Sequence, residues 1–228
     1  MSKPVLRIGL SMRVMTPSNY DDPRDCIAQD WTWFLNRHFP HLHWMALPNR
    51  GKDIESYMDS FQLHGVILTG GNDIGENALR DETETALLNY GLSHGLPVFG
   101  VCRGLQVMHH HAGGQLETLN NSSHVACRHS IKFVREIAGV PSGYNTLVNS
   151  YHNQVVKVLP TVSDYNVLAV TEDKSIEALV HQNKPIMAIQ WHPERRGSDP
   201  EIDMVLLSHW LNWVEAYANG EKLTEVAV

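Results

Sequence analysis

The sequence contains few cysteines and no long uncharged apolar run. The 228 residues include three cysteines, Cys26, Cys102 and Cys127, at irregular spacing. This excludes a disulfide framework, and without a Cys-x-x-Cys pair a structural zinc finger is excluded too. No apolar run approaches the roughly 20 residues of a membrane span, and residues 1–14 lack a secretory signal. We therefore expect a cytoplasmic protein with reduced thiols and no membrane partner.

Positive charge is also scarce. Lys and Arg number 18 against 25 Asp and Glu, which gives a net charge of −7. Because nucleic-acid surfaces need concentrated Lys and Arg, we expect no nucleic-acid partner, although a local cationic pocket for a small anion stays open. The 43% hydrophobic content allows a substantial core. The length predicts one domain spanning residues 1–228.

Apolar segments alternate with segments of helical spacing through the first half of the chain. Strands are predicted over 6–14, 42–48, 64–71 and 96–102. Helices are predicted over 24–38, 53–61, 82–95, 103–114 and 199–217, the last with Met204, Leu207, Leu211 and Val214 on one face. Such alternation indicates an α/β fold with a mostly parallel central sheet. Shorter segments between about 115 and 190 predict an antiparallel ribbon beside that core. The first helix places Cys26, Trp31, Trp33 and Phe34 in the core, although an exposed Trp there could serve a nucleotide.

A cysteine stands where a predicted strand turns into a helix. In PVFGVCRGLQVM, residues 97–108, Cys102 lies between Gly100 and Gly104. Small flanking residues permit a tight turn, and the helix N-terminus that follows stabilises a thiolate. Taken alone, the motif fits a buried structural cysteine equally well.

Two further segments favour a catalytic role for this cysteine. QWHPER, residues 190–195, supplies His192 as a base and Glu194 two residues later as the group that orients it. LTGGND, residues 68–73, follows a core strand, and the N–H of Gly71 could form an oxyanion hole with that of Arg103. Each segment by itself also fits an ordinary turn.

Together, these segments resemble the class I glutamine amidotransferase superfamily, in particular its free-standing γ-glutamyl hydrolase branch, which includes the γ-glutamyl-γ-aminobutyrate hydrolases. The resemblance implies a flavodoxin-like three-layer α/β/α sandwich and a Cys102–His192–Glu194 triad. It implies cleavage of a γ-glutamyl amide through a thioester, with no cofactor. The short loop between GGND and RDETE (80–84), and the SMRV segment, look closer to the γ-glutamyl-CDP-amidate hydrolases of bacterial capsule synthesis.

The resemblance also implies further contacts and leaves one alternative open. The residues that it places at the γ-glutamyl substrate are Gly70, Gln106, Ser150, Tyr151 and His152. Arg103 resembles the hydrolase branch, whereas ammonia-supplying domains more usually carry an uncharged residue there. A glutaminase subunit that passes ammonia to a synthetase on another chain stays the alternative, and a homodimer is left open. A binding protein without chemistry conflicts with the intact triad motif.

Several conspicuous residues are expected to have packing or surface roles rather than a role in chemistry. His109, His110 and His111 would point about 100° apart on a helix, so they cannot chelate one metal ion together. His124 and His129 flank Cys127, but zinc there lacks a fourth ligand, so no metal site is predicted. Arg103 could meet a carboxylate or phosphate of the leaving group, but we rather expect it to form a salt bridge with a nearby acidic side chain. Arg13, Arg24 and Arg80 could also reach an anionic substrate, but solvated roles are expected for each.

Overall fold

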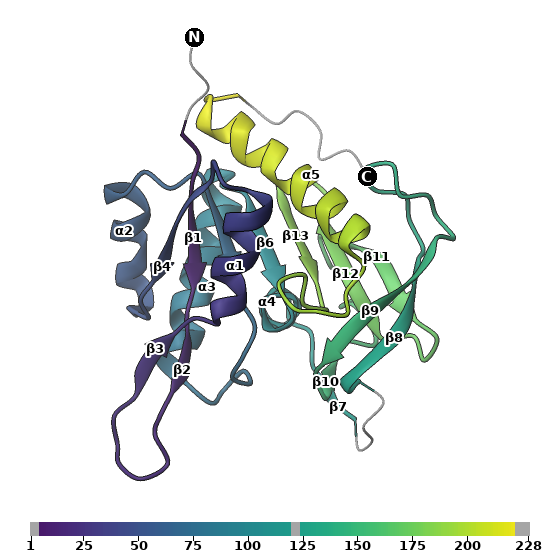
Figure 1. The fold of residues 1–228 in the computed structure, drawn as a ribbon, viewed down its shortest axis with the longest axis horizontal. Helices are drawn as coiled ribbons and strands as arrows, with labels where there is room; N and C mark the ends of the chain where they lie inside the picture. Colours follow the sequence, from purple (N-terminus) through teal and green to yellow (C-terminus); the bar gives the residue numbers. More distant parts are fainter. Residues whose placement is uncertain (1–4, 120–123, 222–228) are drawn as a thin grey trace.

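The computed structural model describes residues 5–119 and 124–221. The main feature of these described residues is one nine-stranded sheet (Figure 1). In spatial order, the strands are β4 (His43–Leu47), β1 (Arg7–Ser11), β5 (Gly65–Leu68), β6 (Val98–Val101), β13 (Ile186–Ile189), β12 (Ile176–His181), β11 (Tyr165–Thr171), β8 (Val125–Phe133) and β9 (Asn145–Tyr151). The first five strands are parallel and the remaining pairings are antiparallel, which confirms the predicted mostly parallel sheet with an antiparallel extension.

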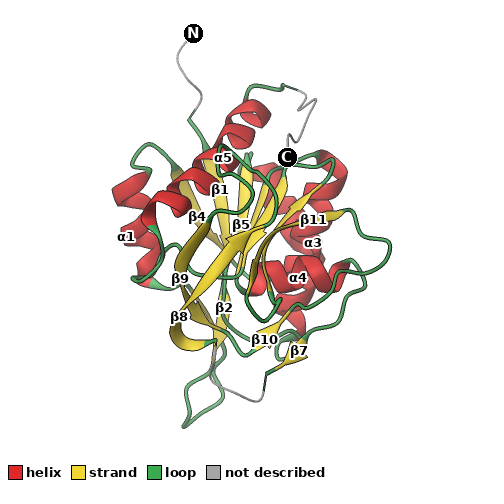
Figure 2. Cartoon of the chain, turned by 90° about the vertical axis from the view of Figure 1, so that its right-hand side faces the viewer, coloured by secondary structure: helices red, strands yellow, loops and turns green. Residues whose placement is uncertain are grey.

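The sheet is covered by helices on both faces (Figure 2). One face carries α1 (Gln29–His38) and α5 (Pro200–Ala218), and the other carries α2 (Ile54–Ser60), α3 (Ala78–His94) and α4 (Arg103–His111). Strand alternation supplies both cores, since Ile67 packs on the first face while Val66 and Leu68 pack on the second. The three-layer α/β/α architecture is therefore as predicted. Within the two described ranges, every helix is too short or too polar to span a bilayer.

The ends of the helices follow local signals. The side chain of Asn77 accepts a hydrogen bond from the Arg80 N–H and begins α3 four residues earlier than predicted. Gly95, with φ of 70°, ends it as predicted. The predicted face of α5 is only partly correct: Met204 and Leu211 are half-buried. The wider apolar stripe of this helix instead buries Trp210 and Trp213.

The N-terminal region differs from the prediction. The strand expected over 6–14 breaks after β1, and β2 (Arg13–Met15) pairs with β3 (Arg24–Cys26) as a separate hairpin. Residues 24–26 were predicted to be helical, but this pairing overrides their helical spacing and α1 begins only at Gln29. Cys26 is therefore half-buried in a strand rather than in the core.

The remaining elements are small. A 3₁₀ turn, η1 (Gly51–Asp53), precedes α2, and a two-stranded ladder joins β7 (Glu117–Thr118) to β10 (Gln154–Val155). The prediction of an antiparallel ribbon is also corrected at one point. β13 pairs in parallel with β6 and so belongs to the parallel half. This pairing matters for the site, because it brings the ends of β6 and β13 side by side.

Candidate active site

Cys102 lies at a sharp bend between β6 and α4. Its φ of 54° and ψ of −101° are strained for a residue with a side chain. The flanking glycines are required by close packing: a Cβ on Gly104 would lie 2.5 Å from the Leu68 carbonyl oxygen. A Cβ on Gly100 would lie 2.8 Å from the carbonyl carbon of Gly104. The bend holds the Cys102 side chain, 8% exposed, at the N-terminus of α4.

His192 and Glu194 follow β13, the parallel neighbour of β6. Nδ1 of His192 is 2.8 Å from Oε1 of Glu194, and both residues are buried. Gly70 leaves room for the imidazole, since a Cβ there would lie 2.7 Å from Cε1 of His192 and 3.5 Å from Cβ of Cys102. The imidazole ring thus lies against Gly70, close to Cys102, with its other side turned to a carboxylate.

The electrostatics of this group favour a thiolate–imidazolium pair. Burial acts to raise the pKa of the Cys102 thiol, but the charge and hydrogen bond of His192 outweigh it, and the pKa lies below its ordinary value. Burial acts to lower the pKa of His192, yet Glu194 and Cys102 raise it to about 9. The Gln190 side-chain amide lies 3.6 Å from Sγ of Cys102 and donates a hydrogen bond to it.

Asn149, in β9, was missed by the sequence analysis although it lies in the VNSYHNQ segment. Its amide nitrogen donates to the carbonyl oxygen of His192 at 2.8 Å, and its oxygen accepts from the His192 N–H at 2.9 Å. The same nitrogen lies 3.3 Å from the carbonyl oxygens of Arg195 and Arg196. A polar residue on an inward-facing strand position was the available signal.

A small cavity of about 100 Å³ opens at Cys102. Among the predicted site residues, it is lined by Gly71, Cys102, Arg103, Gln106, Tyr151 and His152. The ring of Tyr151 lies 5.7 Å from that of His192, and Arg195 stacks on its face at 4.8 Å. Ser150 is not part of this lining, because its hydroxyl donates to the His124 carbonyl oxygen at 2.6 Å.

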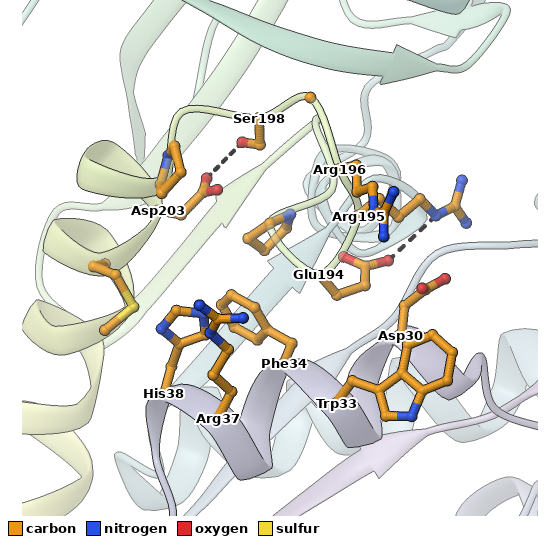
Figure 3. A pocket seen from close by; sticks show the side chains of 14 residues that line it. Asp30, Trp33, Phe34, Arg37, His38, Glu194, Arg195, Arg196, Ser198 and Asp203 are labelled. Carbon is orange, nitrogen blue, oxygen red and sulfur yellow. Dashed lines mark hydrogen bonds and ion pairs between the residues drawn. The ribbon is translucent and has the colours of Figure 1, made fainter.

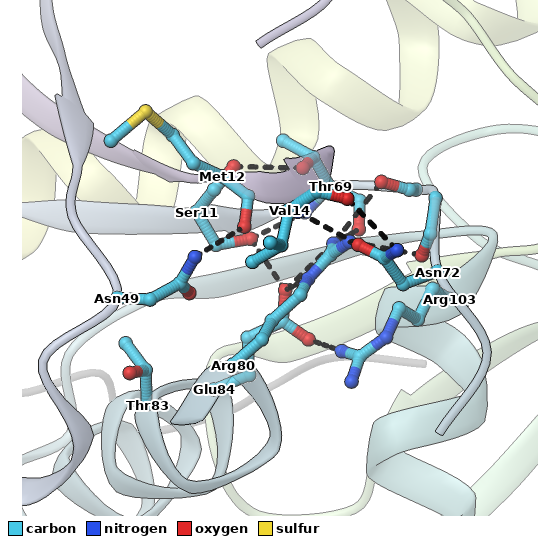
Figure 4. Close-up of polar contacts among 12 residues, drawn as sticks. Ser11, Met12, Val14, Asn49, Thr69, Asn72, Arg80, Thr83, Glu84 and Arg103 are labelled. Atoms are coloured by element: carbon cyan, nitrogen blue, oxygen red, sulfur yellow. Dashed lines mark hydrogen bonds and ion pairs between the residues drawn. The ribbon is translucent and has the colours of Figure 1, made fainter. Parts of the chain in front are cut away.

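A buried ionic network lies beneath the glycine loop (Figure 4). Arg80 is completely buried, so the expectation of a solvated role is wrong. Its guanidinium donates to three successive backbone carbonyl oxygens, over residues 69–71, at 2.9, 3.1 and 3.0 Å. Glu84 pairs with both Arg80 and Arg103. The network therefore fixes the backbone loop that faces Cys102.

The Arg103 side chain is held in this network and away from solvent. It pairs with Asp81 as well as Glu84 and is 2% exposed, so the expected salt bridge is present. Glu84 also accepts a hydrogen bond from the Ser11 hydroxyl at 2.7 Å. RDETE thus supplies three members of the network, Arg80, Asp81 and Glu84, from one helix.

A second pocket, of about 420 Å³, lies on the α1 side of the Glu194 loop (Figure 3). Trp33, which is 66% exposed, Arg37 and Arg196 line it, together with Arg195. Trp31 and Phe34 pack in the core as predicted, whereas Trp33 does not. The pocket therefore presents an exposed aromatic face with both cations and the carboxylates of Asp30, Glu194 and Asp203 around it.

The fold and the site define a class of protein. A three-layer α/β/α sandwich with a cysteine at a strand-to-helix bend, beside a histidine and a glutamate, is the arrangement of the class I glutamine amidotransferase-like hydrolases. The Peptidase C26 family model matches residues 8–194, and the chain belongs to this family. It is accordingly an amide-bond hydrolase.

Known proteins similar to this chain include both hydrolases and synthase subunits. It is 28% identical to the gamma-glutamyl-CDP-amidate hydrolase of Campylobacter jejuni, over 91% of this chain and 98% of that protein. It is 30% identical to a glutamine-hydrolyzing GMP synthase subunit of Methanococcus maripaludis, over 65% of this chain and 72% of that one. A Thermoplasma acidophilum structure assigned to the corresponding GMP synthase subunit has a TM-score of 0.69 at 17% identity, covering 95% and 96% of the two chains, which supports the fold alone.

Proposed function

We propose that the protein hydrolyses a γ-glutamyl amide bond, with Cys102 as nucleophile, and releases glutamate and an amine or amidate. The observation that carries this proposal is the strained cysteine beside a buried imidazole–carboxylate pair. Such a pair keeps the thiol ionised and supplies a proton to the leaving group. Glu194 fixes the tautomer of His192, and Asn149 fixes its backbone.

The reaction proceeds in two halves. The Cys102 thiolate adds to the δ-carbonyl carbon, and the resulting oxyanion collapses as the C–N bond breaks and His192 gives its proton to the nitrogen. This leaves a thioester. Water, deprotonated by the neutral His192, then adds to the thioester, the C–S bond breaks, and glutamate departs while His192 regains its proton.

The oxyanion is held by the N–H groups of Gly71 and Arg103. A trans peptide points its N–H opposite its carbonyl, and the Gly70 carbonyl is bound to Arg80. The Gly71 N–H therefore points away from Arg80. The Arg103 N–H lies in the first turn of α4, where helix donors have no intrahelical partner. Each donor should contribute on the order of 3 kcal/mol to the stability of the transition state.

We further propose an anionic leaving group and, among such substrates, γ-glutamyl-CDP-amidate. Nε of Arg13 lies 3.1 Å from the position of a Cβ on Gly71 and has no hydrogen-bond partner among the described residues. Arg195 lines the same small pocket as Arg13, beside Gly70, and its guanidinium lies over the Tyr151 ring. The similarity to the Campylobacter hydrolase over nearly its whole length supports the same substrate. The Trp33 pocket offers an aromatic surface for the nucleotide.

Glutamate release tests the proposal. The purified chain is incubated with γ-glutamyl-CDP-amidate, γ-glutamyl-γ-aminobutyrate or glutamine, beside Cys102→Ala and the matched Cys26→Ala. We expect the first substrate to give the highest kcat/KM, Cys26→Ala to retain it, and Cys102→Ala to lose it. A glutamyl adduct on Cys102 in quenched reactions, seen by mass spectrometry, identifies the thioester. Full activity of Cys102→Ala would refute the mechanism.

The similarity to the Methanococcus GMP synthase subunit supports one alternative function, that of a glutaminase that supplies ammonia to a separate synthetase. Under this alternative, glutamine is hydrolysed appreciably only after the synthetase chain of the same organism is added. We expect the opposite, with γ-glutamyl hydrolysis by the chain alone and no stimulation by the synthetase.

A further inference from the structure

Three histidines and a glutamate meet behind the pocket wall, in positions that the proposed reaction does not use as acid or base. His124 precedes β8, His129 lies within it, His152 follows β9, and Glu177 lies in β12. One ligand-type atom from each residue lies within 4.8 Å of those from the other three. The sequence analysis rejected zinc near His124 and His129 for want of a fourth ligand. The fold supplies His152 and Glu177.

The polar atoms at this point are buried, yet they lack hydrogen-bond partners within the part of the chain that the structure describes. Both carboxylate oxygens of Glu177, Nδ1 of His124, Nε2 of His152 and both ring nitrogens of His129 are in this state. Glu177 is completely buried. Buried polar atoms in native proteins are almost always satisfied, so this concentration of unsatisfied atoms needs an explanation.

The hydrogen bonds at the outer side of two rings decide their tautomers. Nδ1 of His152 lies 3.1 Å from the carbonyl oxygen of Gln154, which can only accept, so Nδ1 carries the proton. Nε2 of His124 lies 3.3 Å from a carboxylate oxygen of Asp173, so this nitrogen also donates. When the rings are neutral, as metal ligands must be, the inner nitrogens, Nε2 of His152 and Nδ1 of His124, therefore present lone pairs to Glu177. Lone pairs cannot satisfy a carboxylate, and a cation between them can.

The distances from the Glu177 carboxylate to the three rings are close to those around a four-coordinate metal ion. Oxygens of Glu177 lie 3.3 Å from Nε2 of His129, 3.5 Å from Nε2 of His152 and 3.8 Å from Nδ1 of His124. Tetrahedral ligands about 2.0–2.1 Å from zinc are spaced roughly 3.3 Å apart. Gln154 and Asp173 then act as the outer partners that hold ligating imidazoles in their tautomer.

We propose that His124, His129, His152 and Glu177 bind a divalent transition-metal ion, with zinc as the preferred occupant. Neutral imidazoles and one carboxylate are borderline ligands that suit zinc better than calcium or magnesium. Four protein ligands leave no open position, so the ion is structural: it ties β8, β9 and β12 together and holds His152 at the wall of the cavity. The site stands independently of the proposed function.

Metal content tests the site. The purified full-length chain is stripped with chelator, reloaded with ZnSO₄, dialysed and analysed by mass spectrometry. We expect about one equivalent in the wild type, and below about a tenth of one in His129→Ala and Glu177→Gln, since each lacks a ligand. His110→Ala, which alters the exposed histidine tract, is the matched control and should keep the metal. Cys102→Ala should also keep it, which excludes zinc at the reactive thiol.

Cobalt spectroscopy and substitution of one ligand residue by another test whether the metal is bound at this cluster. Co²⁺ in the same chain should give the intense visible absorption of tetrahedral cobalt, and zinc should raise the Tm of the wild type but not of Glu177→Gln. If His129→Ala does not fold, His129→Cys serves instead: it should regain zinc and show a sulfur-to-cobalt charge-transfer band. An absence of bound metal in the wild type, or equal metal in Glu177→Gln, would overturn the proposal and identify the cluster as a protonated imidazole–carboxylate network.

Discussion

Asn149 binds the backbone of His192 on both sides, accepting from its N–H at 2.9 Å and donating to its carbonyl oxygen at 2.8 Å. The two residues come from distant places in the sheet order, since β9 is an edge strand and β13 is central. β9 extends over the carboxyl end of β13 to make this contact. The antiparallel extension therefore helps to position His192.

Replacing Asn149 should lower turnover, although we expect this side chain not to contact the substrate. In Asn149→Ala, both backbone groups of His192 lose their partner, and each unsatisfied buried group costs roughly 1–3 kcal/mol. We expect kcat to fall about 10- to 100-fold, with KM changed little. Steady-state kinetics on γ-glutamyl-CDP-amidate measures this, and Asn145→Ala, an exposed position of the same strand, is the control. A KM increase alone would show that Asn149 contacts substrate instead.

The pH dependence of kcat/KM should report the Cys102–His192 pair. Because the pKa of Cys102 is lowered, the thiolate persists below its ordinary range, and because the pKa of His192 is raised to about 9, the imidazolium persists up to that pH. The active ion pair exists between these two limits, so activity should fall on the alkaline side near pH 9 as the proton donor is lost. Alkylation of Cys102 by iodoacetamide needs only the thiolate, so its rate should fall only on the acidic side of the pH profile.

Glu194→Gln checks the origin of the alkaline limit. Without the carboxylate charge, the pKa of His192 should fall, so the alkaline limit should move to lower pH and the plateau should narrow. An unmoved alkaline limit would mean that a different group controls it.

Gly70 should tolerate no side chain. A Cβ there would lie 2.7 Å from Cε1 of His192, so Gly70→Ala must push the imidazole away from its place near Cys102. We expect kcat to fall about 100-fold or more, because small misplacements of a catalytic group are costly. Gly114→Ala is the matched control: its Cβ would lie 2.1 Å from Cε1 of His109, outside the site. It should lower Tm while the folded fraction keeps its kcat.

Much of the fold could be predicted because its signals are local. Apolar runs of strand length and a closing glycine indicate β1, β4, β5, β6 and the end of α3 without reference to distant residues, whereas the Asn77 cap and the parallel pairing of β13 were missed. The β2–β3 hairpin could not be found this way, since its strands are three residues each and depend on the pairing of Arg13 with Cys26. That the chain is one domain over residues 1–228 stays a prediction.

In the candidate site, too, local motifs could be read from the sequence, whereas contacts between distant residues could not. Motifs that carry chemistry point to Cys102 and His192, and pairing of β6 with β13 brings them together. Arg80 and Asn149 were misread or missed because their importance comes from backbone groups that only the fold places within reach. His152 and Glu177 are 25 positions apart, and no spacing rule would join them.

Arg80 should contribute strongly to stability. It is completely buried, binds three successive carbonyl oxygens and pairs with Glu84, so Arg80→Met leaves a buried carboxylate with fewer partners. Breaking a buried pair in this way costs roughly 3–5 kcal/mol of unfolding free energy. Urea unfolding measures the loss, with the exposed Arg135→Met as control. Arg80→Lys should recover part of the stability but little turnover, because an ammonium cannot hold the loop with the same fork of donors.

Trp33 should distinguish nucleotide substrates from glutamine. Its ring is 66% exposed at a pocket that also contains Arg37 and Arg196, so a base stacked there would gain about 1–3 kcal/mol. Trp33→Ala should therefore raise KM for γ-glutamyl-CDP-amidate roughly 5- to 150-fold and leave KM for glutamine unchanged. Phe61→Ala, exposed at the end of α2, should change neither value. An equal increase in KM for both substrates would contradict stacking of the nucleotide on Trp33, because loss of a stacking surface cannot affect a substrate without a base.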